Sequence, residues 1–256
     1  MARAQDKDLR FFSAYYDRGH LWYERHFDAG GAKRCGEFST SYFYSKDAPE
    51  RVYRYNPEMR LLVSLRDPVA RLISHHRHEI RLGRIGPDVS LARALESNPS
   101  YAEQSMYFTQ LSRWLEWFPL SSFEIVIFEE MFREPERTAR ELYEFVGVRA
   151  SFVPDGMHDK VNEGRIPRSR LLDRGVRLLS SMVRAAGGGR FVDAVKKHGA
   201  KRRVRSGAAR GDRVAVDDAL VDALRARFAD ENARLAAVLG RDLSVWRMSN
   251  GAHRHG

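Results

Sequence analysis

Apolar residues along this chain form two kinds of pattern: short, mainly apolar runs and runs at helical spacing. Two such short runs, 61–65 and 123–128, are bounded by polar residues. Such runs are typical of buried strands in a parallel sheet. Each run is followed by a segment that begins near a proline, Pro68 or Pro135, and continues at helical spacing. Strands alternating with helices predict an α/β fold, a three-layer sandwich with a central parallel sheet.

Helical spacing predicts several further elements around these two strands. One predicted helix starts at Asp47. The others cover 68–82, 101–118, 135–146, 168–185 and 217–239. A packed aromatic segment over 8–28 and a short strand within 34–40 come before them. Strand signals cease after Gly147. We therefore expect a single domain, with an α/β core over 1–150 and a mainly helical extension over 151–256.

Composition narrows the class of protein. Hydrophobic residues make up 43% of the chain, which is enough for a core. No run approaches the roughly 18 apolar residues of a membrane span, and the first residues contain no secretory signal, so we expect a cytoplasmic protein. The lone cysteine, Cys35, excludes an internal disulfide and a cysteine-only metal site, and we expect it to be a small buried apolar residue.

The net charge of +10 favours an anionic partner. A nucleotide, an acidic glycan, a nucleic acid and an anionic membrane surface all satisfy this criterion. Eight Lys/Arg residues lie between Lys196 and Arg213, a run typical of a solvated loop. Nucleic-acid binding through this run is an alternative function. It ranks last because the run lacks the interleaved aromatic residues that stack on bases.

The segment from Arg66 to Ser74 is the most informative stretch. Arg66 directly follows the run at 61–65, at the end of a strand where open α/β sheets bind ligands. Ser74 follows two helical turns into the next helix, so the two side chains could hold one phosphate between them. The alternative is a surface arginine paired with Asp67 beside a helix-capping turn.

This segment reads R-D-P-V-A-R-L-I-S and resembles the 3′-phosphate-binding motif R-x-P-x-x-R-x-x-S of sulfotransferases. Four other segments resemble heparan-sulfate-type and related bacterial sulfotransferases, namely 7–27, 36–52, 105–131 and 238–246. The resemblance implies a P-loop-NTPase-like fold. It also implies that Arg66 and Ser74 bind the 3′-phosphate of 3′-phosphoadenosine 5′-phosphosulfate, with a carbohydrate hydroxyl or amine as acceptor and no metal.

The same resemblance suggests catalytic residues. Asp8 stands where the family has a glutamate base, and a shorter carboxylate there has less reach. Glu37 matches a family glutamate near the site, and His78 lies one turn after Ser74, where N-sulfating relatives place a functional histidine. The alternatives are an exposed acid near a chain end for Asp8 and a helix-surface histidine for His78.

The other nucleotide-binding segments of the family are the weakest part of the match. Arg210 and Gly211 loosely match a late K-G-R loop of the family, and a solvated basic loop is the alternative. The family's first strand and its Gly-rich loop K-x-G-T-[ST], which hold the 5′-phosphosulfate, have no counterpart in this sequence. We expect that loss to leave a gap between the strands at 61–65 and 123–128, or an exposed edge beside them. Poor stability and weak transfer would follow, and an inactive nucleotide-binding remnant is the alternative function.

Overall fold

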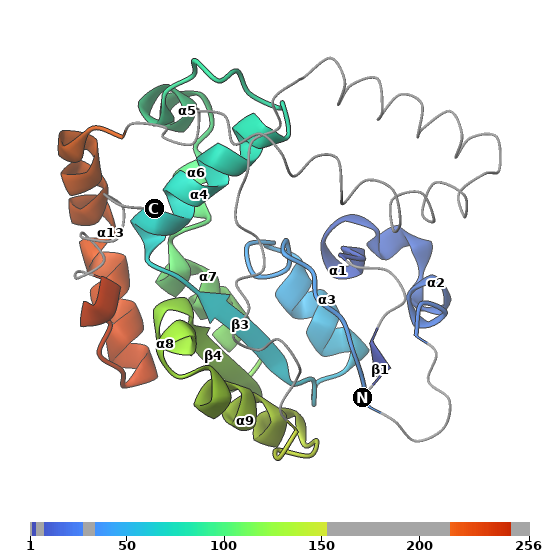
Figure 1. Ribbon diagram of the computed structural model, residues 1–256. Coiled ribbons are helices and arrows are strands. Elements are labelled where there is room, and N and C mark those ends of the chain that lie inside the picture. Colours follow the sequence, from blue (N-terminus) through green and yellow to red (C-terminus); the bar gives the residue numbers. More distant parts are fainter. Residues whose placement is uncertain (1, 4–7, 28–33, 153–215, 247–256) are drawn as a thin grey trace, which may run out of the picture. The chain divides into compact units, whose positions relative to one another are not determined.

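The computed structural model describes residues 2–3, 8–27, 34–152 and 216–246 (Figure 1). The chain divides into two compact units. The first unit comprises Met1–Arg71, Ala102–Asp159 and Ala223–Gly256, and the second comprises Leu72–Tyr101 and Lys160–Asp222. The helix predicted over 168–185 lies outside the described residues. A single domain with a helical extension stays a prediction.

The parallel pair of strands predicted at 61–65 and 123–128 is confirmed. Strand β3 (Leu61–Leu65) pairs in parallel with β4 (Phe123–Ile127), from Leu61 opposite Phe123 to Leu65 opposite Ile127. The two strands lie side by side in Figure 1. The predicted gap between them is therefore wrong. In the described part of the chain the pair forms a two-stranded sheet, and a missing neighbouring strand stays a prediction.

Burial differs between the two strands. In β4, Phe123, Ile125 and Ile127 point into the core, and the residues between them are half-buried. In β3, Leu62 is 50% exposed and Ser64 is also exposed. The interpretation of 61–65 as a fully buried strand is therefore wrong, because only Leu65 of β3 is buried.

A second, shorter pair lies near the N-terminus. Strand β1 (Ala2–Arg3) pairs in parallel with β2 (Cys35–Gly36). The strand predicted within 34–40 is thus only two residues long. Cys35 is exposed, and the expectation of a buried cysteine is wrong. Residues 37–40 leave the strand and bond the Asp8 segment instead.

Most predicted helices form close to their predicted bounds. They are α3 (Ala48–Tyr55), α4 (Pro68–Arg81), α9 (Pro135–Val146) and α13 (Asp218–Leu239). The helix predicted over 101–118 is instead two, α6 (Ser100–Glu103) and α7 (Tyr107–Leu115). The break falls at Ser105, whose side chain is fully buried and donates a hydrogen bond to the carbonyl of Pro68 at 3.1 Å. A buried polar side chain with a distant backbone partner can outweigh helix continuation.

Short helical segments complete the described structure. They are α1 (Phe11–Ala14), η1 (Tyr16–Arg18), α2 (His20–Glu24), α5 (Leu91–Ser97), η2 (Leu120–Ser122), α8 (Phe128–Arg133) and η3 (Ser244–Trp246). Segments α1 to α2 confirm a packed aromatic stretch over 8–28. Phe11 and Phe12 are buried, and the Phe11 ring stacks on Tyr23 with ring centres 4.7 Å apart.

The core of the first unit draws on segments far apart in the sequence. Aromatic residues of the N-terminal segment, the strands and α7 share one cluster with Leu235, Leu243 and Trp246 from the C-terminal part. In the second unit, Leu72, Ile80 and Leu91 are buried. No helix among the described residues has the length and apolar character needed to span a membrane.

Candidate functional site

Arg66 leaves the carboxyl end of β3 in the first unit. Its guanidinium carbon lies 4.8 Å from the centre of the Phe128 ring, a cation–π contact. Its Nε atom is buried and has no hydrogen-bond partner among the described residues. A buried N–H without a partner is costly, so the group is suited to receive a ligand oxygen. An anion site at Arg66 stays a prediction.

The turn after Arg66 is fixed through Asp67. This residue is 4% exposed, and its Oδ1 atom accepts the Ala70 N–H at 2.8 Å, which caps the start of α4. The capping turn of the alternative interpretation is therefore present. The backbone N–H of Asp67 also donates to Oε1 of Glu129 at 3.0 Å. The position of Arg66 is thus set by bonds on the residue that follows it.

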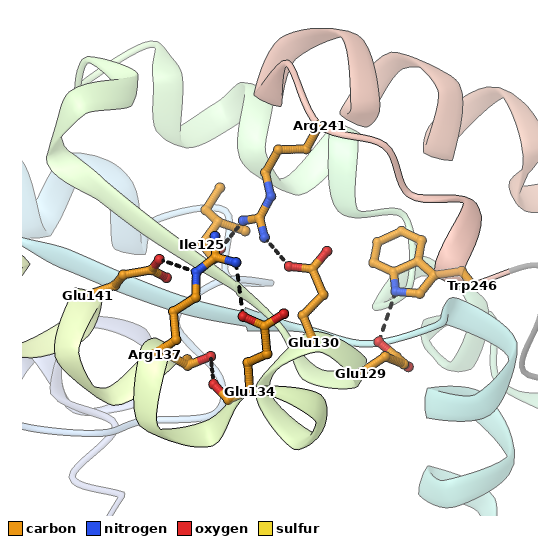
Figure 2. A network of polar contacts seen from close by, with 9 residues as sticks. Ile125, Glu129, Glu130, Glu134, Arg137, Glu141, Arg241 and Trp246 are labelled. Atoms are coloured by element: carbon orange, nitrogen blue, oxygen red, sulfur yellow. Dashed lines mark hydrogen bonds and ion pairs between the residues drawn. The ribbon is translucent and has the colours of Figure 1, made fainter. Parts of the chain in front are cut away.

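Glu129 joins this turn to the C-terminal part of the chain. Its Oε2 atom accepts the indole N–H of Trp246 at 3.0 Å. Figure 2 shows this bond beside a second one, in which Arg241 contacts Glu130. Arg241 also donates to the carbonyl of Ile125 at 2.6 Å. The segment 238–246, which resembles the C-terminal ending of the family, is therefore bonded to the end of β4.

A cavity of about 510 Å³ lies against the same turn. Asp67, Val69, Phe228, Leu243 and Trp246 are among its lining residues, and all belong to the first unit. The space is concave and mainly apolar with a few polar groups, as ligand sites commonly are.

Arg71, the second arginine of the motif, has a structural partner. Its Nε atom donates to Oγ of Ser105 at 2.6 Å, and Nη1 donates to Gln104 at 3.3 Å. Burial lowers the pKa of Arg71. Burial raises the pKa of the neighbouring Tyr107 phenol. The charge of Arg71 and a hydrogen bond from the backbone of Arg66 lower it. Arg71 therefore ties α4 to the residues just before α7.

Ser74 and His78 are exposed on α4, in the part of this helix that belongs to the second unit. A guanidinium nitrogen of Arg81 lies 2.6 Å from Nδ1 of His78. Because a guanidinium only donates, Nδ1 is the acceptor and the neutral ring carries its proton on Nε2. Partial desolvation of the ring and then the charge of Arg81 lower the pKa of His78. Arg66 and Asp8 belong to the first unit, so the predicted pairs Arg66–Ser74 and Asp8–His78 stay predictions.

Asp8 lies in a constrained segment. Its backbone has φ 63° and that of Arg10 has φ 55°, a left-handed conformation that is uncommon for residues other than glycine. The Asp8 N–H donates to the Phe38 carbonyl at 3.2 Å, and its Oδ1 atom accepts the Thr40 N–H at 3.1 Å. The Arg10 N–H donates to Oγ of Ser39 at 2.9 Å. Such strain persists only where surrounding contacts impose it, and it is concentrated at functional sites.

Glu37 lies beside Asp8 in the same set of contacts. Its carboxylate accepts hydrogen bonds from the hydroxyls of Ser39, at 3.1 Å, and of Tyr42. Burial raises the pKa of Glu37, and the neighbouring Asp8 acts in the same direction. The structure therefore brings together the two predicted catalytic carboxylates. It gives Glu37 two hydroxyl donors, and Asp8 mainly backbone and Thr40 partners.

Two predicted site residues cannot be placed, and two residues near Arg66 were not predicted. Arg210 and Gly211 lie outside the described residues. Within the described part of the chain, no group of three or more His, Cys, Asp or Glu side chains is arranged to hold a metal ion. Sequence reasoning missed Phe128 and Glu129, although both directly follow the second strand, at the sheet edge where ligands bind.

Comparison with known proteins bears on the family resemblance and on the fold. Residues 45–165, which include Arg66, Ser74 and His78, match the family model described as "Sulfotransferase domain". The resemblance to sulfotransferases is confirmed. The fold agrees as well: a solved sulfotransferase from Alicyclobacillus acidocaldarius is similar with a TM-score of 0.67 and 23% identity, covering 96% of this chain and 87% of that one.

Curated relatives match a smaller share of the chain. Heparan sulfate glucosamine 3-O-sulfotransferase 6 of Mus musculus is 29% identical over 160 residues, which is 57% of this chain and 45% of that protein. The human protein of the same name matches to the same extent. The chain thus spans less than half the length of these curated relatives.

Proposed function

We propose that this protein transfers a sulfuryl group from 3′-phosphoadenosine 5′-phosphosulfate to a hydroxyl or amine of a carbohydrate. The observation that carries the proposal is Arg66 at the end of β3, with a buried Nε that lacks a partner among the described residues. The match to the sulfotransferase domain includes this residue. The names of the curated relatives support a carbohydrate acceptor.

In this reaction the acceptor oxygen or nitrogen attacks sulfur. The bond from sulfur to the 5′-phosphate oxygen breaks, which leaves adenosine 3′,5′-bisphosphate, and the acceptor proton must go to a base. Asp8 is the proposed base, because both carboxylate oxygens of Glu37 already accept a hydroxyl hydrogen bond. Arg66 and Ser74 are the proposed ligands of the 3′-phosphate.

His78 has a different proposed role. Its Nδ1 atom accepts from Arg81, so the free Nε2–H is a donor. A neutral donor of this kind can stabilise negative charge that develops on the transferred group. Proton abstraction is thus assigned to Asp8 and charge stabilisation to His78.

The test has two parts. Calorimetry should detect adenosine 3′,5′-bisphosphate binding, weakened about 10- to 150-fold by Arg66→Ala, since a hydrogen bond to a charged group contributes about 1.5–3 kcal/mol. Mass spectrometry should detect sulfated product when the donor is mixed with hexosamine oligosaccharides that carry free hydroxyls and amines. Binding without transfer to any acceptor would identify the inactive remnant. Affinity that Arg66→Ala does not change would contradict the anion site.

A further inference from the structure

Glu129 bridges two parts of the first unit that lie far apart in the sequence. One carboxylate oxygen accepts the backbone N–H of Asp67 at 3.0 Å, and the other accepts the Trp246 indole N–H at 3.0 Å. Trp246 and Asp67 are each 4% exposed. Two N–H donors from buried residues on one half-buried carboxylate form a charge-assisted pair of bonds.

The bridge reaches Arg66 by two routes. Asp67 follows Arg66 directly, so the bond from its N–H to Glu129 fixes the peptide that joins them. Phe128 precedes Glu129, and its ring faces the Arg66 guanidinium at 4.8 Å. A change at Glu129 therefore acts on both the backbone and the side-chain contact of Arg66.

We infer that Glu129 is a positioning residue of the anion site and that Trp246 anchors it. Glu129 makes no contact with the nucleotide in this role. It holds the turn so that the Arg66 guanidinium points to one phosphate position. The inference rests on the proposed function, since it takes the ligand of Arg66 to be the 3′-phosphate of an adenine nucleotide.

Glu130 provides a matched control within the same helix. It is also a half-buried glutamate of α8, and its partner is Arg241 instead of the turn. Figure 2 shows the two neighbouring carboxylates with their separate partners. Glu129→Gln and Glu130→Gln each remove one charge from the same helix turn. In Glu129→Gln, the amide has one oxygen to accept from two N–H donors, and its own NH₂ faces the other donor.

The experiment measures discrimination, the ratio of affinities for adenosine 3′,5′-bisphosphate and adenosine 5′-monophosphate, by calorimetry. We expect Glu129→Gln to lower this ratio about 3- to 10-fold through weaker bisphosphate binding, with monophosphate affinity unchanged. We expect Glu130→Gln to leave the ratio as it is. A general loss of stability would weaken both ligands alike, so the ratio separates positioning from folding. In Arg66→Ala, adding Glu129→Gln should lower the ratio no further.

The results separate the two proposals. Equal affinity of the unmodified protein for both nucleotides would contradict the proposed anion site, and this inference would fail with it. Discrimination that Glu129→Gln leaves intact would overturn this inference alone. If that variant does not fold, Trp246→Phe keeps the packing but removes the indole donor. It should lower the ratio. Trp117, a partly buried tryptophan after α7 whose ring lies 5.5 Å from that of Tyr53, is the control: Trp117→Phe should not lower the ratio. Equal ratios in these two variants would also overturn the inference.

Discussion

The Oδ1 atom of Asp8 accepts the backbone N–H of Thr40 at 3.1 Å across 32 residues of sequence. This bond aligns the proposed base with the segment that carries Glu37. It also helps to keep Asp8 at φ 63°, a conformation that an aspartate rarely adopts. The carboxylate is therefore held in place before any substrate arrives, which is what a catalytic base requires.

Asp8→Asn removes the proposed base but keeps the hydrogen bond that holds the side chain in place. The asparagine oxygen can still accept the Thr40 N–H, while the amide cannot take a proton. We expect the transfer rate to fall about 10²- to 10⁴-fold, the range for loss of a general base, with little change in melting temperature. Product formation at saturating substrates gives the rate, and Asp8→Glu, which restores the longer family carboxylate, should retain measurable transfer. Full activity of Asp8→Asn would exclude Asp8 as the base.

Glu37 should make stability depend on pH. Burial raises its pKa above the ordinary value of 4.5, so the folded state holds this proton more tightly than the unfolded state. The contribution of Glu37 to the unfolding free energy is then highest below pH 4.5, and it declines as the pH rises through the raised pKa. When the pH rises from 4.5 to 7, we expect the melting temperature of Glu37→Gln to fall less than that of the unmodified protein. Equal losses in a thermal melt series would contradict the raised pKa.

His78 should titrate below an ordinary histidine, and Arg81 should be part of the reason. Partial desolvation of the ring is the larger cause of the lowered pKa, and the charge of Arg81 adds to it. Arg81→Gln removes that charge, so we expect the pKa of His78 to rise. Nuclear magnetic resonance of the ring nitrogens measures this directly. In the unmodified protein, it should also find the proton of the neutral ring on Nε2. A neutral ring protonated on Nδ1 would contradict the assigned hydrogen bond.

The local elements of this fold could be predicted because each has a signal in a short window. Pro68 and Pro135 mark the starts of α4 and α9, and both helices follow within a residue of prediction. The break between α6 and α7 was not predictable, because it depends on the bond from Ser105 to Pro68, 37 residues away. Exposure of Leu62 likewise depends on which neighbours cover β3, and a single strand's sequence does not contain that information.

The candidate site was predictable where residue type and position coincide. Arg66 stands out as a cation at the end of a strand. Glu129 was missed because an acid pair after a strand is typical of a solvated helix start, and only the folded chain brings Asp67 and Trp246 to it. The left-handed backbone at Asp8 also has no sequence signal, since no glycine marks it.

Arg241 offers a test of how the C-terminal segment stabilises the first unit. It donates to the Ile125 carbonyl and contacts Glu130, and both partners lie on the segment formed by β4 and α8. Because Arg241→Ala removes a charged donor and leaves a strand carbonyl without it, we expect a loss of about 1–2 kcal/mol in unfolding free energy. Urea denaturation measures this.

Arg137, also drawn in Figure 2, is the matched control for that test. It pairs with Glu134 and Glu141 of its own helical segment, and its side chain is 68% exposed. Water and salt screen such pairs, so we expect Arg137→Ala to change stability little. The contrast depends on where each arginine bonds: Arg241 joins segments more than a hundred residues apart, while Arg137 bonds within one helix turn. Equal losses in the two variants would mean that the C-terminal segment is held by the packing of Leu243 and Trp246 rather than by Arg241.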